Sequence, residues 1–241
     1  MTLGRRRFLV SVLAGLGSFL FRFPAGPDVS RAEIVSSPVS EYINKTRRGI
    51  YRFFYIQVYK PFRRIREGDW RLRVTGLCER PGEFSLAALR SLPLKTQVSR
   101  LKCVECWSAK AQWEGFHFSE LEKTVRPLPS AAGVVFRCAD TYVEYLPLGD
   151  LRHPRTLMAH RMDGQPLSGE HGFPLRVIIP FKYGYKNPKC ILEMEFVDHE
   201  EPGTWSRIGP YSVDGTILPG YDHPLDRNKE KRRINGGEVF D

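Results

Sequence analysis

The sequence predicts an α+β fold, a single mixed domain in which short mixed β-sheets and short helices surround a deep cleft. Several short stretches alternate apolar and polar residues, as half-buried strands do. The helical stretches between them are brief and are bounded by capping residues and proline. The chain has 241 residues, 41% of them hydrophobic, which is enough for one large domain or two small ones.

The first 32 residues resemble an export leader. The motif Gly4-Arg5-Arg6-Arg7-Phe8-Leu9 fits the twin-arginine pattern, and residues 8–21 form an apolar run that is too short and glycine-rich for a clear membrane span. The twin-arginine translocase carries folded proteins, which suits a protein that takes up a cofactor before export. An ordinary secretory signal or a membrane-anchoring helix is the alternative. We therefore expect a periplasmic or other extracytoplasmic protein, which is membrane-associated if the leader is not cleaved.

The main domain is expected over residues 33–225, and a charged tail follows at 226–241. Residues 69–76 alternate apolar and basic positions and therefore predict a half-buried strand. Ser85 can cap a short helix over residues 86–92.

Beyond residue 95, the same patterns predict one helix and a series of strands. Ser119 and Glu122 fit a capping box at the start of the helix. A strand leads directly into Cys103, and Asp163-Gly164 is typical of a hairpin turn. The other predicted strands cover residues 134–138, 142–146, 156–162, 175–179 and 191–197.

The chain is basic, with a formal net charge of +10. That balance suggests an anionic partner or cofactor, although a basic surface is also common without one. Residues 33–68 interleave basic and aromatic side chains, a composition that can bind single-stranded nucleic acid. Because an exported protein meets little nucleic acid, we favour a solvated basic strip with inward-packed aromatic residues and expect no nucleic-acid partner.

Residues 101–116 hold the most informative cysteines. Cys103 and Cys106 flank Glu105, and two of the four tryptophans lie nearby. Cys103 ends a predicted strand, and we expect a loop of small and polar residues, lined with indoles, to follow it. A thiolate presented in this way suits a soft metal or a redox reaction. The chain has five cysteines, so at least one should remain unpaired or bind something.

A second informative stretch covers residues 171–189. His171 precedes its predicted strand, and Lys182, Lys186 and Lys189 follow that strand. Backbone donors and ammonium groups at strand ends can converge on one phosphate. The alternative, which composition alone favours, is a core strand with ordinary surface lysines.

The motif Cys-Val-Glu-x-Trp-Ser at 103–108, followed by Trp-x-Gly-Phe at 113–116, resembles the molybdopterin-dependent sulfite oxidase family. Within it, the chain is most similar to the branch of periplasmic protein-methionine-sulfoxide reductase catalytic subunits. The resemblance implies a sulfite oxidase-type molybdopterin-binding fold and a molybdenum-molybdopterin cofactor in its mononucleotide form. Cys103 would be the thiolate ligand of molybdenum. Glu105 would be a catalytic group that influences protonation, with a loop salt bridge as the alternative.

The same resemblance implies further cofactor contacts. His-Gly-x-Pro-x-Arg from residue 171 and Tyr-Gly-x-Lys-x-x-Lys from residue 183 are similar to the family's pterin and phosphate contacts. The family often has an aspartate near the cofactor at the position of Asp140, for which a turn residue is the alternative. The family's usual Asn-His pair is absent near Tyr55. The implied cofactor-binding residues are Tyr55, Gln57, Cys103, Asp140, His171, Arg176, Lys186, Asn187, Pro188 and Lys189.

The implied activity is oxygen-atom transfer at a sulfur centre, namely the reduction of protein methionine sulfoxide. Sulfite dehydrogenation is the alternative within the family, because His171 is the residue that sulfite oxidases carry. Two alternatives come from other classes: a dithiol redox motif formed by Cys103 and Cys106, or a non-catalytic basic binding module. The haem-attachment motif Cys-x-x-Cys-His would need a histidine at position 107, where this chain has Trp107. We therefore expect no haem in this chain. The resemblance implies a membrane haem-containing subunit for electron transfer.

Overall fold

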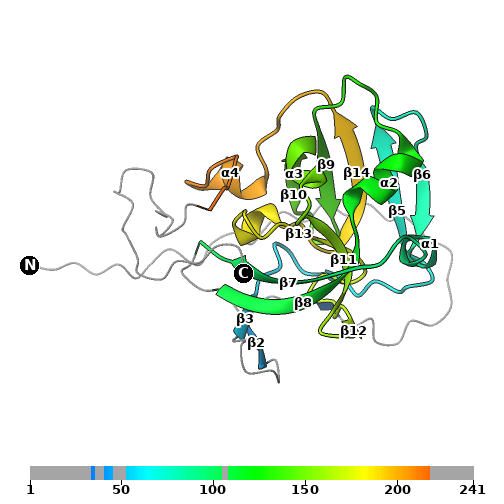
Figure 1. Ribbon diagram of the computed structural model, residues 1–241. Coiled ribbons are helices and arrows are strands. Elements are labelled where there is room, and N and C mark those ends of the chain that lie inside the picture. Colours follow the sequence, from blue (N-terminus) through cyan, green and yellow to red (C-terminus); the bar gives the residue numbers. More distant parts are fainter. Residues whose placement is uncertain (1–33, 36–40, 46–52, 105–107, 218–241) are drawn as a thin grey trace, which may run out of the picture. The chain divides into compact units, whose positions relative to one another are not determined.

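Two five-stranded sheets dominate the computed structural model, which describes residues 34–35, 41–45, 53–104 and 108–217 (Figure 1). The predicted leader at 1–32, the residues Glu105, Cys106 and Trp107, and the charged tail at 226–241 lie outside the described residues. The described residues fall within one compact unit. No helix in these ranges has the length and apolar character that a membrane span requires.

The first sheet has the strand order β10-β9-β14-β5-β6. It is mixed, because β14 pairs parallel to β5 while the other neighbours pair antiparallel. Figure 1 shows β9, β14, β5 and β6 side by side. The strands are β5 (Arg71–Gly76), β6 (Gly82–Ser85), β9 (Gly133–Cys138), β10 (Val143–Pro147) and β14 (Ile191–Val197).

The second sheet has the order β12-β11-β8-β7, and β13 also pairs with β11. Its strands are β7 (Lys95–Lys102), β8 (Ser108–Phe116), β11 (Leu157–Met162), β12 (Gln165–Pro166) and β13 (Arg176–Ile178). Two short ladders complete the described strands: β1 (Ile34–Val35) with β4 (Phe62–Arg63), and β2 (Glu41–Lys45) with β3 (Phe53–Ile56).

The helices are short, as the sequence predicts. They are α1 (Leu86–Arg90), α2 (Phe118–Val125), α3 (Leu148–Arg152), the 3-10 helix η1 (Gly184–Lys186) and α4 (Thr204–Ile208). The predicted cap of α1 is confirmed, because the Ser85 side chain accepts a hydrogen bond from Ala88 N at 3.1 Å. The predicted capping box of α2 is wrong. The ring of His117 accepts from Ser119 N instead, so α2 begins one residue before the predicted cap.

The loop expected after Cys103 is also wrong over its second half, where residues 108–116 form β8. Ala109, Ala111 and Trp113 alternate on the buried face of this strand, and Trp113 is fully buried rather than lining a loop. Gly115 allows β8 to approach β11, because a Cβ at this position would lie 1.9 Å from the Met158 carbonyl oxygen. Alanines are poor strand formers, so their role here depends on tertiary packing that the sequence pattern does not reveal.

The predicted α+β fold is confirmed, and several predicted elements have the observed bounds to within a residue or two. β14 covers the predicted residues 191–197, and the turn at Asp163-Gly164 joins β11 to β12 with a positive φ at both residues. The main core packs around the first sheet and includes Leu72, Phe136 and Phe196. Two isolated bridges then assemble the site: Lys102 pairs with Tyr183 at the end of β7, and Arg176 pairs with Lys189.

Candidate cofactor site

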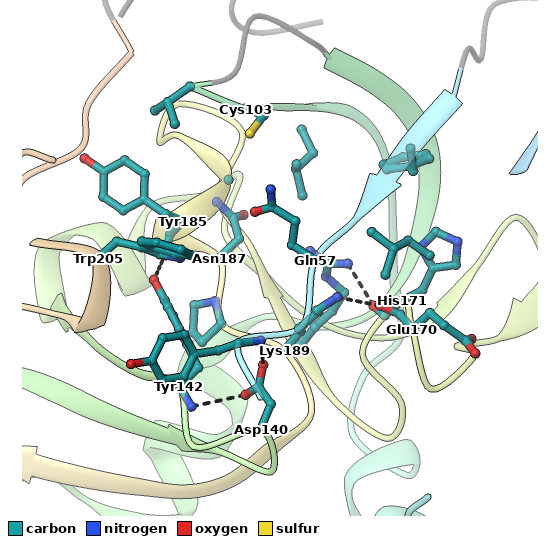
Figure 2. Close-up of a pocket in the computed structure, with 18 of the residues that line it drawn as sticks. Gln57, Cys103, Asp140, Tyr142, Glu170, His171, Tyr185, Asn187, Lys189 and Trp205 are labelled. Atoms are coloured by element: carbon teal, nitrogen blue, oxygen red, sulfur yellow. Dashed lines mark hydrogen bonds between the residues drawn. The ribbon is translucent and has the colours of Figure 1, made fainter. Parts of the chain in front are cut away.

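One pocket gathers most of the residues that the sequence singled out. It encloses about 1000 Å³, including its open mouth. Figure 2 shows the Cys103 sulfur above the amide groups of Gln57 and Asn187, with Lys189 and Asp140 below them and His171 to one side. Of the ten residues implied as cofactor contacts, eight line this pocket: Gln57, Cys103, Asp140, His171, Arg176, Asn187, Pro188 and Lys189.

Cys103 lies where β7 ends, at the upper side of the pocket in Figure 2. The bridge between Lys102 and Tyr183 fixes this strand end against the start of η1. Gly184 makes the contact close, since a Cβ there would lie 3.1 Å from a Leu101 methyl group. Cys103 itself is half-buried and packs, as Tyr185 and Tyr211 also do, against the small cluster of Val104, Tyr183 and Ile217. Its thiol is therefore both positioned by backbone pairing and open to the pocket.

The opposite side of the pocket is cationic. Arg176 is 5% exposed, and its Nη1 donates to the His171 carbonyl oxygen at 2.8 Å. Among the described residues, its Nε finds no hydrogen-bond partner. Lys189 Nζ donates to the Glu170 carbonyl oxygen at 2.6 Å. Each cation is thus held by a backbone carbonyl, and the carboxylates of Asp140 and Glu170 also act electrostatically on Lys189. Both cations can still donate hydrogen bonds to an anion in the pocket.

Burial perturbs all three basic groups here. It lowers the pKa of Arg176 to about 10 and the pKa of Lys189 to about 8. Burial, followed by repulsion from Arg176 and Lys189, lowers the pKa of His171 to about 4. His171 is therefore neutral at physiological pH, while the two cations remain charged in a poorly hydrated environment. A bound phosphate would offset the energetic cost of removing these cations from water.

The buried charge of Lys189 predicts that the stability of the protein depends on pH. The Lys189 ammonium group holds its proton less tightly in the folded chain than in the unfolded chain, where the pKa of lysine is near 10.5. The buried charge therefore destabilises the cofactor-free protein below about pH 8, and the penalty fades as the pH rises toward 10.5. We expect the unfolding free energy of the wild type, relative to Lys189→Met, to be lower at pH 7 than at pH 10. Denaturant titrations of both proteins at both pH values measure the difference in unfolding free energy. If this difference is the same at pH 7 and pH 10, the charge of Lys189 is not the cause.

Two loops bring the cationic groups together. Gly172 adopts φ +110°, and a Cβ at this residue would lie 2.7 Å from Lys189 Cβ. Only glycine therefore fits between the loop of His171 and the segment of Lys189. The His171 ring meets Phe54 of β3 edge-on, with the ring centroids 5.5 Å apart. The structure thereby explains the local His-Gly spacing as a close backbone approach.

Asp140 and Asn187 both line the pocket and also brace it. The Asp140 carboxylate accepts hydrogen bonds from the backbone N–H groups of Tyr59 at 2.8 Å and Tyr142 at 3.2 Å, as an aspartate in a turn does. Asn187 Oδ1 accepts from Ile179 N at 2.6 Å, and its Nδ2 donates to the Tyr183 carbonyl oxygen at 3.0 Å. These side chains hold separate segments together around the same space.

Two of the implied cofactor contacts, Lys186 and Tyr55, are not among the pocket residues described above, and Tyr55 stays a prediction. Lys186 does not line the pocket; its Nζ lies 2.5 Å from Glu144 Oε1 and 2.8 Å from the Tyr145 carbonyl oxygen, and both charged side chains are buried. The side chain of Tyr55 and all of Glu105 lie outside the described residues. Lys186 therefore stabilises the fold behind the pocket in this structure.

Sequence reasoning missed a group of aromatic residues in the same pocket. Trp205 and Tyr211 lie in a stretch rich in glycine, proline and charge, which is more typical of a solvated tail. The sequence places Tyr142 in a predicted strand and indicates no role for it in a site. Nothing in their spacing links them, because they meet only through the tertiary fold. The missed residues are Tyr59, Tyr142, Tyr185, Trp205 and Tyr211.

The donor set suits a cofactor that brings its own ligands. Within the described ranges, no three side chains of His, Cys, Asp or Glu gather to hold a metal ion. Among the described residues, Cys103 would supply the protein ligand, and further ligands would come from the pterin dithiolene. The thiol at one side of the pocket and the cations at the other fit a phosphate-bearing pterin with a soft metal.

The dithiol alternative does not fit the structure. A thioredoxin-like motif requires a helix that starts between the two cysteines. Here, the described segments on either side of residues 105–107 are the antiparallel strands β7 and β8. Cys78, Cys138 and Cys190 are buried thiols rather than disulfide partners in the part of the chain that the structure describes.

Comparisons with known proteins agree with the site. The family profile described as an oxidoreductase molybdopterin binding domain matches residues 59–205. A protein-methionine-sulfoxide reductase catalytic subunit from Burkholderia mallei is 33% identical over 238 residues, covering 90% of this chain and 71% of that protein. Its counterpart from Gluconobacter oxydans is 34% identical, covering 71% of this chain. The chain spans 61% of the Gluconobacter protein.

A solved structure shares the fold. The sulfane dehydrogenase SoxCD from Paracoccus pantotrophus superposes with a TM-score of 0.57 at 16% identity, covering 89% of this chain and 62% of that one.

Proposed function

This chain belongs to the family of oxidoreductase molybdopterin-binding domains, and from that membership we propose that it is the catalytic subunit of a protein-methionine-sulfoxide reductase. It is an oxidoreductase with a molybdenum-molybdopterin cofactor. A non-catalytic binding module is thereby excluded. The observation that carries the proposal is the convergence of Cys103, Arg176 and Lys189 on one pocket, although more than 70 residues separate Cys103 from the two cations in sequence.

The chain's own residues would divide the work between the two sides of the pocket. Cys103 would hold the molybdenum through its thiolate, and Arg176, Lys189 and neutral His171 would bind the phosphate of the pterin. When bound, the cofactor supplies two-electron redox chemistry with transfer of one oxygen atom. The reaction takes a sulfoxide, two electrons and two protons to a thioether and water. Glu105 lies close in sequence to Cys103 and is our candidate for influencing proton transfer.

The electrons must come from outside the chain. The relatives are described as catalytic subunits, which supports a partner subunit. We infer a membrane haem-containing partner, and we expect no haem in this chain. The twin-arginine motif supports export through the twin-arginine translocase to the periplasm, with residues 1–32 as signal or anchor and residues 226–241 as a charged tail. We expect the cofactor in its mononucleotide form.

Steady-state assays on molybdenum-loaded protein test the activity. With a reduced dye as the electron donor, we expect turnover of a peptide that contains methionine sulfoxide. With a dye acceptor, we expect sulfite oxidation to be far slower, because the pocket cations are committed to the cofactor phosphate. The matched control is the same peptide with unoxidised methionine. Faster turnover of sulfite than of the sulfoxide peptide would reject the reductase assignment and favour a sulfite dehydrogenase.

A further inference from the structure

Five aromatic residues form a continuous wall on one side of the pocket. We call Tyr59, Tyr142, Tyr185, Trp205 and Tyr211 the aromatic wall. Neighbouring rings meet edge-on or tilted, with centroid distances between 5.4 Å and 6.3 Å. Figure 2 shows Tyr142, Tyr185 and Trp205 grouped on the side away from His171 and Glu170. The pocket thus has an aromatic side and a cationic side.

The aromatic wall adjoins the thiol that would hold the metal. Cys103 packs in one cluster with Tyr185 and Tyr211, on the buried base formed by Val104, Tyr183 and Ile217. A substrate that reaches the metal from the pocket mouth would therefore contact aromatic faces near Cys103.

A buried network holds the wall in place. The Tyr142 hydroxyl lies 2.9 Å from Glu144 Oε2 and 2.6 Å from the Tyr185 carbonyl oxygen. Glu144 pairs with Lys186 behind the wall. A Cβ on Gly203 would lie 2.3 Å from the Glu144 carboxylate, so the start of α4 rests directly on this group and positions Trp205. The network makes the wall a preformed surface.

Two hydrogen-bond donors of the wall are left for a ligand. In the described part of the chain, no group accepts a hydrogen bond from the Trp205 indole N–H or from the Tyr59 hydroxyl. The two rings lie 6.1 Å apart at 79°. By contrast, the Tyr185 hydroxyl already donates to the Ser212 carbonyl oxygen at 2.7 Å. The two donors therefore mark one part of the wall as suited to an acceptor oxygen.

This combination matches one class of substrate. A methionine sulfoxide side chain has a neutral, strongly accepting oxygen, a methyl group and a short methylene stem. Aromatic faces bind methyl groups and sulfur favourably, and indole or phenol donors satisfy the oxygen. Sulfite is an anion and gains little from such a surface.

We propose that the aromatic wall is the subsite that binds the alkyl sulfoxide side chain of a polypeptide substrate, with Trp205 and Tyr59 donating to its oxygen. The inference rests on the proposed reductase function and names its specificity-determining residues. Glu144 acts as a positioning residue, because it reaches the substrate only through Tyr142 and α4.

The test is an equilibrium binding measurement with a fluorescent peptide that carries one methionine sulfoxide. It uses the molybdenum-loaded protein, and fluorescence anisotropy gives Kd without turnover when no electron donor is present. We expect Trp205→Leu to raise Kd about tenfold, and we expect Tyr59→Phe to raise it by a smaller factor, in line with the loss of one pocket contact. Phe181→Leu is the matched control. Phe181 is a half-buried aromatic residue that packs on His153 and does not line the pocket.

The outcomes separate this inference from the proposed function. If the wild type binds the sulfoxide peptide through the wall but does not reduce it, the reductase function fails and the subsite stands. If the wild type binds no sulfoxide peptide, or both wall variants bind within twofold of it, the subsite is wrong. Molybdenum content is measured for each variant, with Trp205→Phe replacing Trp205→Leu if the latter does not fold. Loss of molybdenum in place of weaker peptide binding would show that the wall holds the pterin, and would overturn the proposal.

Discussion

Replacement of Cys103 with serine should remove molybdenum from the purified protein and reduce sulfoxide turnover by more than about 100-fold. Loss of a residue that merely supports a metal ligand typically costs about 10–100-fold, so loss of the ligand itself should cost more. The thiol lies at the end of β7 beside the aromatic wall, where no other described cysteine lines the pocket. Elemental analysis by mass spectrometry and the sulfoxide assay measure the two effects.

Cys78→Ser is the matched control for Cys103→Ser. Cys78 is buried, and its thiol lies 3.8 Å from the Thr75 carbonyl oxygen, outside the pocket. We expect this variant to keep its molybdenum and its turnover number, with at most a modest loss of stability. Full molybdenum and activity in Cys103→Ser would show that another group holds the metal.

Replacement of Lys186 with methionine should lower the free energy of unfolding by about 3–5 kcal/mol, because it leaves a buried charge uncompensated. Lys186 is 1% exposed and Glu144 is 0% exposed, and the pair has a separation of 2.5 Å. Burial raises the pKa of Glu144 above its ordinary value even with Lys186 opposing that shift. Without the lysine, the carboxyl group must be neutral or remain charged in the protein interior. Urea titration of the cofactor-free protein gives the free energy without a contribution from cofactor binding.

A double variant separates a structural role of Lys186 from a role in cofactor binding. Glu144→Leu combined with Lys186→Met removes both charges and should recover part of the lost stability, since apolar pairs can replace buried ion pairs. Recovery will be incomplete, because Tyr142 and the backbone N–H of Tyr145 also use Glu144 as an acceptor. If Lys186→Met instead keeps its stability and loses molybdenum, the lysine acts at the cofactor.

The sequence was informative where local patterns decide the structure. The alternation over residues 191–197 predicted β14, because its apolar face meets the core and its glutamates face outward. Ser85 predicted the start of α1, because a hydroxyl at this position can accept the hydrogen bond of a first-turn N–H. The strand ending at Cys103 was predicted, like β14, from the alternation of its side chains. Such signals depend only on neighbours in the chain.

The features that the sequence missed depend on distant contacts. β8 has alanines on its buried face. In the sequence they give no apolar alternation strong enough to predict a strand, and their burial becomes clear only in the folded sheet. A lysine in a cation-rich segment can face either the pocket or the core, and the sequence does not say which. The backbone of η1 decides that the Lys186 side chain points into the core. The aromatic wall joins residues from positions 59 to 211, and no motif spans that distance. The site was therefore predictable at its thiol and cations, and its aromatic side was not.

Molybdenum-edge X-ray absorption tests the central claim most directly, because it counts the sulfur atoms bound to the metal. The claim is that the Cys103 sulfur is a ligand of the bound molybdenum. The account predicts that protein purified from a molybdenum-competent host contains the metal, and that the residual metal in Cys103→Ser has one sulfur ligand fewer than in the wild type. Identical sulfur shells in the two proteins, or a catalytically active wild type without molybdenum, would contradict it.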